Sequence, residues 1–381
     1  MIEIDNRKKF VERVFNKNSA AIVVESSQYF IPYLDVMFKS MLSCANPENN
    51  YDIIVLGNEI EEYDEEVIRK AYCAYENVSI RFFNPHKLVE SYIEEAQNKY
   101  LDINYYRLAL PWILCKYDKA VQLGADIVVK RDIAELYRTE FTQDECLAGC
   151  RDLGYLGRLN MDIPKEELGM KNPGDYVNAD VLVYNLKGIR EKYDMDKIMQ
   201  VWQKYPFRCA EQDALNMILD GGVKILDSRW NVFPTRMVSE LHISNSPQKL
   251  QEQRMQDLKD PWIVHFAAIP KVWDYPMVGE GTTWWKFARQ SVYYEEILRR
   301  LMIFTVKVEN SHEKLSWAKR TELAFFPVGS KRRKAVKKII PRNSALWNVA
   351  KAIKNGLHCV IVFLSGGHQE TKYGKLRSSA K

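Results

Sequence analysis

The first hundred residues alternate short apolar runs with longer segments of helical periodicity. The apolar runs, rich in Ile, Val and Phe, are residues 20–24, 52–56 and 78–83. The segments that follow them repeat apolar residues every three or four positions and are residues 32–45, 63–75 and 86–100. Such alternation predicts βαβ units and a largely parallel sheet flanked by helices. Ligands bind beyond the carboxyl ends of the strands in these sheets, so polar residues after each strand are site candidates.

The stretch from Tyr117 to Asp132 is the centre of this pattern. Its apolar run predicts a buried strand that stops at Gly124-Ala125-Asp126 and resumes at residues 127–129. Asp132 then stands three residues before Glu135, which is typical of a helix start. A lone carboxylate where a strand leaves the core can hold a metal ion or a phosphate-bearing ligand. Asp126 is therefore either such a ligand or only a turn-forming residue, and this stretch alone leaves both interpretations open.

Other predicted elements also carry polar residues at their ends. Residues 176–186 predict a buried strand, residues 191–205 a helix, and Glu211-Gln212-Asp213 the start of another helix, where polar side chains either cap the helix or face a ligand. Residues 263–266 predict a strand that ends near His265, six residues before Lys271. Residues 151–175 show no strong periodicity, so we expect a long loop or lid there.

Arg107 lies in a mostly apolar segment, residues 104–111, that leads into the central strand. A buried guanidinium needs a partner, because an unpaired charge in the core is costly. The partner is either a carboxylate of the core or a phosphate group, which the planar guanidinium can bind as a fork. The sequence contains no G-x-G-x-x-G and no Walker loop, so a dinucleotide site and a P-loop both lack support.

A chain of 381 residues can form one large α/β domain with an appendage. We expect the domain to span residues 1–305 and the appendage residues 306–381. Seven scattered cysteines without a C-x-x-C motif favour a reducing cytosol. We expect no signal peptide, because no basic segment precedes an apolar core at the N-terminus. We also expect no spanning helix, because no run approaches about 20 apolar residues.

The charge of the chain is unevenly distributed. Residues 310–381 hold 16 Lys and Arg against 3 Asp and Glu, whereas the remainder holds 39 against 47. A basic tail indicates an anionic partner, either lipid or nucleic acid. Residues 344–354 place Leu346, Trp347 and Ile353 opposite two lysines, which is typical of a helix in a membrane interface. No nucleic-acid fold signature is present. We expect a cytoplasmic protein that is peripheral on the inner face of the cell membrane; a helix packed on the domain is the alternative.

Motifs in a fixed order across residues 20–275 resemble glycosyltransferase family 8. These retaining, nucleotide-sugar-dependent enzymes include bacterial lipopolysaccharide galactosyl- and glucosyltransferases and the glycogenins. The motifs are Tyr106-Arg107-Leu108, Leu123 to Val129 with Asp132 to Tyr137, Asn178-Ala179 with Asn185-Leu186, Glu211 to Asn216, and His265 with Lys271 and Trp273. The resemblance implies an α/β protein of the GT-A nucleotide-sugar-binding fold, with a mixed, mostly parallel central sheet, here followed by a basic helical tail. It further implies transfer of a hexose from a UDP-sugar to a saccharide or lipid-linked acceptor, with retention of anomeric configuration.

The resemblance also implies which residues hold the metal ion and the diphosphate. Asp126 matches the second Asp of the family's Asp-x-Asp motif and, with His265, would bind Mn²⁺ or Mg²⁺. Lys271 would contact the donor phosphate, and Arg107 would grip the donor. A divalent cation together with these two basic residues would stabilise the negative charge that grows on the leaving diphosphate.

The sugar and the nucleoside have their own implied residues. Asn178, Gln212 and Asp213 would be the catalytic residues that line the sugar pocket, with Gln212 facing the anomeric carbon. The loop that contains Ser26 and Gln28 would contact uracil and ribose, although the acidic residues usual in the family are absent from residues 26–28.

Three positions depart from the family pattern. Gly124 replaces the first Asp of the motif, which removes a carboxylate, so the metal ion should bind more weakly. Asp180 replaces a usual Gly and lies either near the pocket or at a surface edge. Ala268 replaces the usual Gly three residues after His265.

These departures leave three functions open. The first is an active transferase with altered metal use, in the synthesis of a cell-surface polysaccharide or lipopolysaccharide. The second is a degenerate protein that binds a nucleotide sugar without transferring it, and the third is a membrane-associated scaffold. The joint presence of Asp126, His265, Lys271 and Arg107 favours the active enzyme.

Overall fold

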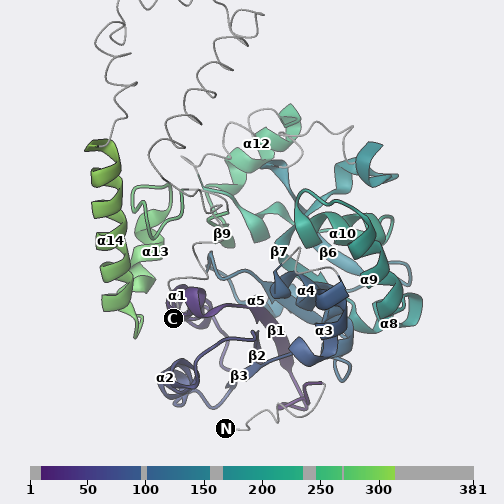
Figure 1. Ribbon diagram of the computed structural model, residues 1–381, viewed down its shortest axis with the longest axis horizontal. Helices are drawn as coiled ribbons and strands as arrows, with labels where there is room; N and C mark the ends of the chain where they lie inside the picture. The colour runs from purple at the N-terminus through teal and green to yellow at the C-terminus, as the bar shows by residue number, and fades with distance from the viewer. Residues whose placement is uncertain (1–9, 96–100, 155–165, 235–245, 268–269, 314–381) are drawn as a thin grey trace, which may run out of the picture. The chain divides into compact units, whose positions relative to one another are not determined.

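The computed structural model describes residues 10–95, 101–154, 166–234, 246–267 and 270–313 (Figure 1). By its contacts the chain divides into a unit of residues 1–305 and a unit of residues 306–381. The described part of the second unit is the end of helix α14 (Tyr294–Glu313). Among the described residues, no helix combines the length and the apolar character needed to cross a membrane.

A seven-stranded sheet with the order β3-β2-β1-β4-β7-β6-β8 forms the centre of the first unit. Its strands are β1 (Ser19–Glu25), β2 (Asn50–Leu56), β3 (Val78–Phe83), β4 (Ala120–Leu123), β6 (Leu147–Arg151), β7 (Val177–Tyr184) and β8 (Val223–Ile225). Strand β7 runs antiparallel to both β4 and β6, and the other neighbours in the sheet pair in parallel. The predicted mixed, mostly parallel sheet is therefore confirmed.

Helices cover both faces of this sheet (Figure 1). On one face, Ala21 and Val23 of β1 pack in a core with residues of α3 (His86–Glu95), α4 (Asp102–Ile113), α8 (Leu186–Lys192), α9 (Met195–Lys204) and α10 (Ala210–Ile218). On the other face, Ile22 and Val24 pack with α1 (Ile31–Leu42), α2 (Glu62–Tyr72) and α5 (Ile133–Tyr137). Burial of both faces explains why these strands are continuous apolar runs in the sequence.

Several predicted elements have different bounds in the structure. The helix expected over residues 191–205 is two helices, because α8 ends at Lys192 and the side chain of Asp194 caps α9 by accepting the N–H of Asp196. The segment expected to lead into the central strand lies in α4. Strands β6 and β8 were not predicted, because one is poor in β-branched residues and the other has three residues. Asp132 caps α5, as its position predicted.

Some predictions fall on residues outside the described part of the chain. They concern residues 96–100 of the third predicted helix, residues 155–165 of the expected loop, Ala268, and residues 314–381 of the basic tail. At the ends of the expected loop, Arg151 closes β6 and a short 3₁₀ helix, η2 (Pro173–Asp175), precedes β7.

A second sheet of two strands begins where the chain leaves β4. Strand β5 (Ile127–Val129) pairs antiparallel with β9 (Ile263–His265), with Ile127 opposite His265. Behind it, α13 (Gly281–Ala288) and α14 join α1 in an aromatic core, in which Tyr33 stacks on Trp273 at 4.1 Å between ring centroids. The turn Gly124 to Asp126 thus links the two sheets and brings Asp126 beside the end of β9.

Candidate active site

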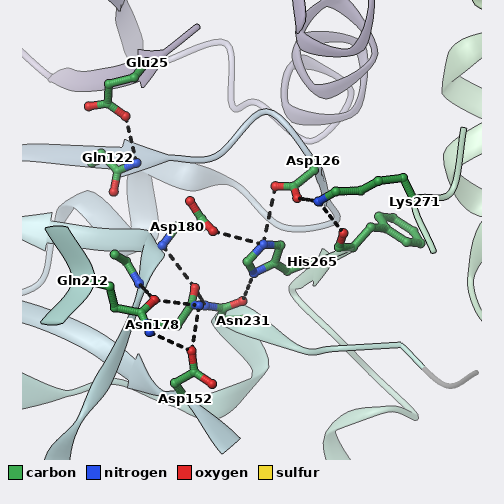
Figure 2. Close-up of polar contacts among 12 residues, drawn as sticks. Glu25, Gln122, Asp126, Asp152, Asn178, Asp180, Gln212, Asn231, His265 and Lys271 are labelled. Carbon is green, nitrogen blue, oxygen red and sulfur yellow. Dashed lines mark hydrogen bonds and ion pairs between the residues drawn. The ribbon is translucent and has the colours of Figure 1, made fainter. Parts of the chain in front are cut away.

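Three metal-binding side chains converge where β4, β7 and β9 meet. Asp126 follows β4, Asp180 lies in β7 and His265 ends β9 (Figure 2). Nε2 of His265 lies 3.4 Å from a carboxylate oxygen of Asp126 and 3.4 Å from one of Asp180. The imidazole is fully buried, whereas the Asp180 side chain is 29% exposed. The cluster therefore opens toward solvent on the side of Asp180.

The three groups shift each other's ionisation. Burial by itself would lower the pKa of His265, but the charges of Asp126 and Asp180 raise it to about 9. Burial would raise the pKa of Asp126, but the charges of Lys271 and His265 hold it well below its usual range. Burial acts likewise on Asp180, and Arg107 outweighs it to lower the pKa to about 2. Both carboxylates are therefore ionised at neutral pH and favour a proton on Nε2 of His265, which a bound metal ion would have to replace, because a ligating imidazole is neutral.

Lys271 lies on the other side of Asp126. Its Nζ forms an ion pair with Oδ2 of Asp126 and donates a hydrogen bond to the carbonyl of Phe266 at 3.0 Å. Oδ1 of Asp126 is the oxygen that faces His265 (Figure 2). The two oxygens of the Asp126 carboxylate thus link Lys271 to His265, which places Lys271 beside the cluster; its role in phosphate binding stays a prediction.

Arg107 has carboxylate partners from three elements. Its guanidinium bonds to Glu25 at the end of β1 (3.1 Å), to Glu211 in α10 (2.7 Å) and to Asp180 (2.9 Å). The residue is 9% exposed. Of the two partners considered for Arg107, a core carboxylate is the one that the structure contains. A direct contact of Arg107 with the donor stays a prediction.

A chain of amide groups runs from Asp152 to His265 and has one direction (Figure 2). Asp152 can only accept, so Asn178 donates to it through Nδ2 at 3.1 Å. Oδ1 of Asn178 then accepts from Nδ2 of Asn231 at 2.9 Å. Oδ1 of Asn231 is left to accept from Nδ1 of His265 at 2.8 Å. The chain thus places a proton on Nδ1 and turns Nε2 toward Asp126 and Asp180.

Gln212 joins this chain and is held at both ends of its side chain. Its Oε1 accepts from Asn178 (3.1 Å) and from the N–H of Ala179 (2.9 Å), and its Nε2 donates to Asp152 (3.0 Å) and Tyr176 (3.1 Å). The structure therefore brings Gln212 and Asn178, both predicted from the sequence, into one rigid network with His265.

Asp213, Ser26 and Gln28 have contacts of other kinds. Asp213 is buried and accepts from the Tyr176 hydroxyl at 2.6 Å and from two backbone N–H groups before α10. Gln28 bonds through its side chain to Asp64 and to the N–H of Glu61, at the start of α2. Ser26 is buried, and its hydroxyl donates to the carbonyl of Ser27. These contacts fix local structure, and the predicted functional roles of the three residues stay predictions.

Sequence reasoning missed two residues of the site. Asp152 follows β6 directly, so the signal that singled out Asp126, a carboxylate after a strand, would have found it if β6 had been predicted. Asn231 lies in the 3₁₀ helix η3 (Ser228–Asn231), where no periodicity in the sequence indicates its contact with a histidine 34 positions away.

The cluster fits a divalent metal ion. Nε2 of His265 is buried and makes no hydrogen bond within the described part of the chain. One donor atom each from Asp126, Asp180 and His265 lies within 4.8 Å of the other two. Two carboxylates and one imidazole suit a cation such as Mn²⁺, which accepts both oxygen and nitrogen donors. A cation there would be bound by Nε2 directly, in place of the proton that the two carboxylates favour.

Two solved glycosyltransferases are similar to this chain in fold. The bifunctional glycosyltransferase WbbM superposes with a TM-score of 0.71 and 23% identity, over 77% of this chain and 53% of that one. The galactosyltransferase LgtC, solved with donor and acceptor sugar analogues, superposes with a TM-score of 0.58 and 24% identity, over 71% of this chain and 96% of that one. These likenesses confirm the predicted GT-A fold.

Sequence comparisons lead to one family. A glycosyltransferase of Haemophilus influenzae is 27% identical over 219 residues, which is 56% of this chain and 63% of that protein. The human glycosyltransferase 8 domain-containing protein 2 is 23% identical over 235 residues, 53% of this chain and 63% of that protein. The chain thus matches less than two thirds of the length of these relatives. The profile of glycosyl transferase family 8 matches residues 21–276. With this match over the whole candidate site, the chain belongs to glycosyltransferase family 8.

Proposed function

We propose that the protein transfers a hexose from a UDP-sugar to a saccharide or lipid-linked acceptor, with retention of anomeric configuration. The convergence of Asp126, His265 and Lys271 beyond the end of β4 is the observation that carries this proposal. In a member of family 8, these residues would form a site for a diphosphate and its cation. Galactosyl transfer by the structural neighbour LgtC supports a hexose as the transferred sugar.

Asp126 and His265 would hold Mn²⁺ or Mg²⁺ in this proposal. A divalent cation there would offset the negative charge of the UDP leaving group as the glycosidic bond breaks. Lys271, beside Asp126, would add a second positive charge near the diphosphate oxygens of the UDP leaving group. Because Gly124 replaces a carboxylate of the family motif, the sequence predicts that Asp126 and His265 bind this cation more weakly.

Gln212 and Asn178 would orient the donor sugar. The network holds both side chains in place before substrate arrives, so little reorganisation is needed when charge develops at the anomeric carbon. We place Gln212 opposite the anomeric carbon, and its amide group is a poor nucleophile. Retention is therefore consistent with attack from the face that the diphosphate leaves, with the departing phosphate taking the acceptor proton.

Calorimetric titration of UDP, in the presence of Mn²⁺ and then of EDTA, tests the donor site. We expect UDP to bind with Mn²⁺ and to bind at least tenfold more weakly with EDTA. Binding that EDTA leaves unchanged would mean that Lys271 and Arg107 carry the diphosphate without a metal ion. Loss of binding in both conditions would reject a UDP donor and favour the scaffold function.

A screen of UDP-hexoses for hydrolysis and transfer tests the enzyme itself. Release of UDP from one UDP-hexose, absent in Asp126→Asn, is the expected result. If UDP binds and no UDP-hexose is turned over with any saccharide acceptor, the protein is the degenerate binding protein instead.

We further propose that the basic tail attaches the protein to the inner face of the cell membrane, in the synthesis of a surface polysaccharide or lipopolysaccharide. The excess of Lys and Arg in residues 310–381 supports electrostatic attraction to anionic lipid. The full chain should sediment with phosphatidylglycerol vesicles and not with phosphatidylcholine vesicles. A chain that ends before Ser330 should stay in solution, and its continued binding to the anionic vesicles would refute the attachment.

A further inference from the structure

Gly124 and Asp180 face each other across the antiparallel pair of β4 and β7. Leu123 lies opposite Val181, and the N–H of Gly124 donates to the carbonyl of Asp180 at 2.8 Å. Opposite residues of antiparallel strands send their side chains to the same side of the sheet. Any side chain at position 124 would therefore share its space with the carboxylate of Asp180.

Two side chains would crowd that space. A Cβ at position 124 would lie 3.1 Å from Cβ and 3.3 Å from Cγ of Asp180, and 3.1 Å from Oδ1 of Asp126. Gly124 is not among the residues with positive φ. A side chain at position 124 would therefore require Asp180 or Asp126 to shift by a few tenths of an ångström, and glycine leaves this space to Asp180.

Asp180 is held in a fixed orientation. Oδ1 accepts from Arg107 at 2.9 Å, and the backbone N–H donates to Oδ1 of Asn178 at 3.0 Å. Oδ2 then lies 3.4 Å from Nε2 of His265, the buried nitrogen without a hydrogen bond among the described residues. Oδ1 of Asp180 is thus held by the guanidinium of Arg107. Oδ2 of Asp180 and Oδ1 of Asp126 both face Nε2 of His265.

We propose that Asp180 is a third protein ligand of the divalent cation and that Gly124 makes room for it. This inference rests on the proposed function, in which Asp126 and His265 hold the cation. The two carboxylates together match the charge of a divalent ion, and they come from neighbouring strands. The family pattern has a carboxylate at position 124 and glycine at position 180, so this chain supplies the same charge from the opposite strand. The metal site is rearranged and has not lost a carboxylate.

Binding of Mn²⁺, followed through the electron paramagnetic resonance signal of free Mn²⁺, tests the assignment without an activity measurement. Asp180→Asn should weaken Mn²⁺ binding by about tenfold or more, because the loss of an outer-shell partner alone costs about 10–100-fold in metal affinity. Asp118→Asn is the control, because that side chain is 72% exposed and pairs with the exposed Arg13. Binding by Asp180→Asn equal to that of the wild type would overturn the inference.

The exchange between the two positions has its own test. Gly124→Asp should lower Mn²⁺ affinity or stability, because its Cβ meets Asp180. Asp180→Gly should lower affinity by removing the ligand. The double variant Gly124→Asp/Asp180→Gly should bind Mn²⁺ within a few-fold of the wild type. A double variant that is no better than its parents would refute the exchange, even where Asp180→Asn fails to fold.

The same titrations, repeated with UDP present, separate this inference from the proposed function. Wild-type protein that binds neither Mn²⁺ nor UDP refutes both. Wild-type protein that binds UDP without any bound Mn²⁺ refutes only the metal site. Mn²⁺ binding lost in Asp126→Asn and kept in Asp180→Asn would leave the proposed function intact and reject Asp180 as a ligand.

Discussion

The imidazole of His265 is oriented through a chain of amide groups that begins at a carboxylate. Asp152 accepts from Asn178, which accepts from Asn231, which in turn accepts from Nδ1 of His265. Each amide can satisfy its neighbours in one orientation only, because the donor and acceptor ends of an amide differ. A residue with no direct part in ligand binding can therefore decide which ring nitrogen faces the metal site.

Asn231→Ala tests this chain. The substitution removes the acceptor for Nδ1, so His265 is free to rotate, and Mn²⁺ affinity should fall by about 10–100-fold. It also leaves buried polar groups unpaired, which should cost about 1–3 kcal/mol in urea unfolding. Asn49→Ala is the matched control: Asn49 is equally buried, at 7% exposure, and bonds to Asp132 and Arg138. We expect similar destabilisation in the control and unchanged Mn²⁺ binding. Equal Mn²⁺ affinity in both variants would contradict the role of Asn231.

Arg107 neutralises three carboxylates, two of which are buried. Arg107→Met keeps the side-chain length and leaves Glu25, Glu211 and Asp180 without their shared cation. Removing one partner of a buried ion pair costs about 3–5 kcal/mol, so urea unfolding should show a loss of that size. Arg107→Lys should recover only part of it, because a point charge cannot reach three directions as the guanidinium does. A loss below about 1 kcal/mol would show that the three carboxylates find other partners.

At the scale of the element, the short helix η3 carries Asn231 to the site. Asp227 caps this helix by accepting the N–H of Arg229 at 3.1 Å and pairs with its guanidinium, which lies 3.8 Å from the ring centroid of Trp262. Trp262 directly precedes β9, the strand that ends in His265. The cap therefore joins the two segments that supply Asn231 and His265.

Asp227→Ala should lower stability in a pH-dependent way. Its hydrogen bonds with Arg229 lower the pKa of Asp227, so the carboxylate stabilises the folded state above its unfolded pKa, near 4. The contribution is lost as pH falls through the lower folded pKa. Because the side chain is 39% exposed, solvent screening limits the effect to about 0.5–1 kcal/mol. Urea unfolding should show a larger difference between Asp227→Ala and the wild type at pH 7 than at pH 3, and an equal difference at both values would contradict a role for the charge.

The two-stranded sheet is the element that assembles the cluster. The antiparallel register places Ile127 opposite His265, and the N–H of Phe266 donates to the carbonyl of Asp126 at 2.9 Å. A shift of one residue would turn His265 to the other face. Val128 and Val264 pack in the aromatic core with Trp284, which stabilises this register.

At the scale of the whole molecule, the site joins both sheets and one of the helix layers of residues 1–305. Its residues come from the main sheet, the small sheet, α10 and η3. A ligand bound there contacts segments that are far apart in the sequence, so it should stabilise the unit as a whole.

Mn²⁺ and UDP together should therefore raise the melting temperature. At a concentration one hundred times its Kd, a ligand that binds only the folded state adds about 2.7 kcal/mol, or on the order of 5 °C in Tm. Differential scanning fluorimetry should show this rise in the wild type and its loss in Asp126→Asn. A rise of equal size with UDP and EDTA would assign the stabilisation to the nucleotide alone.

The sequence by itself determined the layers of the fold and pointed to two of the three side chains of the cluster. Apolar runs predict strands because a strand that is buried on both faces, such as β1 or β2, has apolar residues at nearly every position. Asp126 and His265 stand where predicted strands end, and the family resemblance implied that both bind a metal ion. The tertiary structure decided the rest: the departure of β5 from the main sheet, the position of Asp180 opposite Gly124, and the contact of Asn231 with His265. These depend on strand register and on amide orientation, which arise between residues far apart in the chain. A local sequence pattern indicates which residues are buried, whereas a contact between two distant side chains depends on how the strands pack against each other.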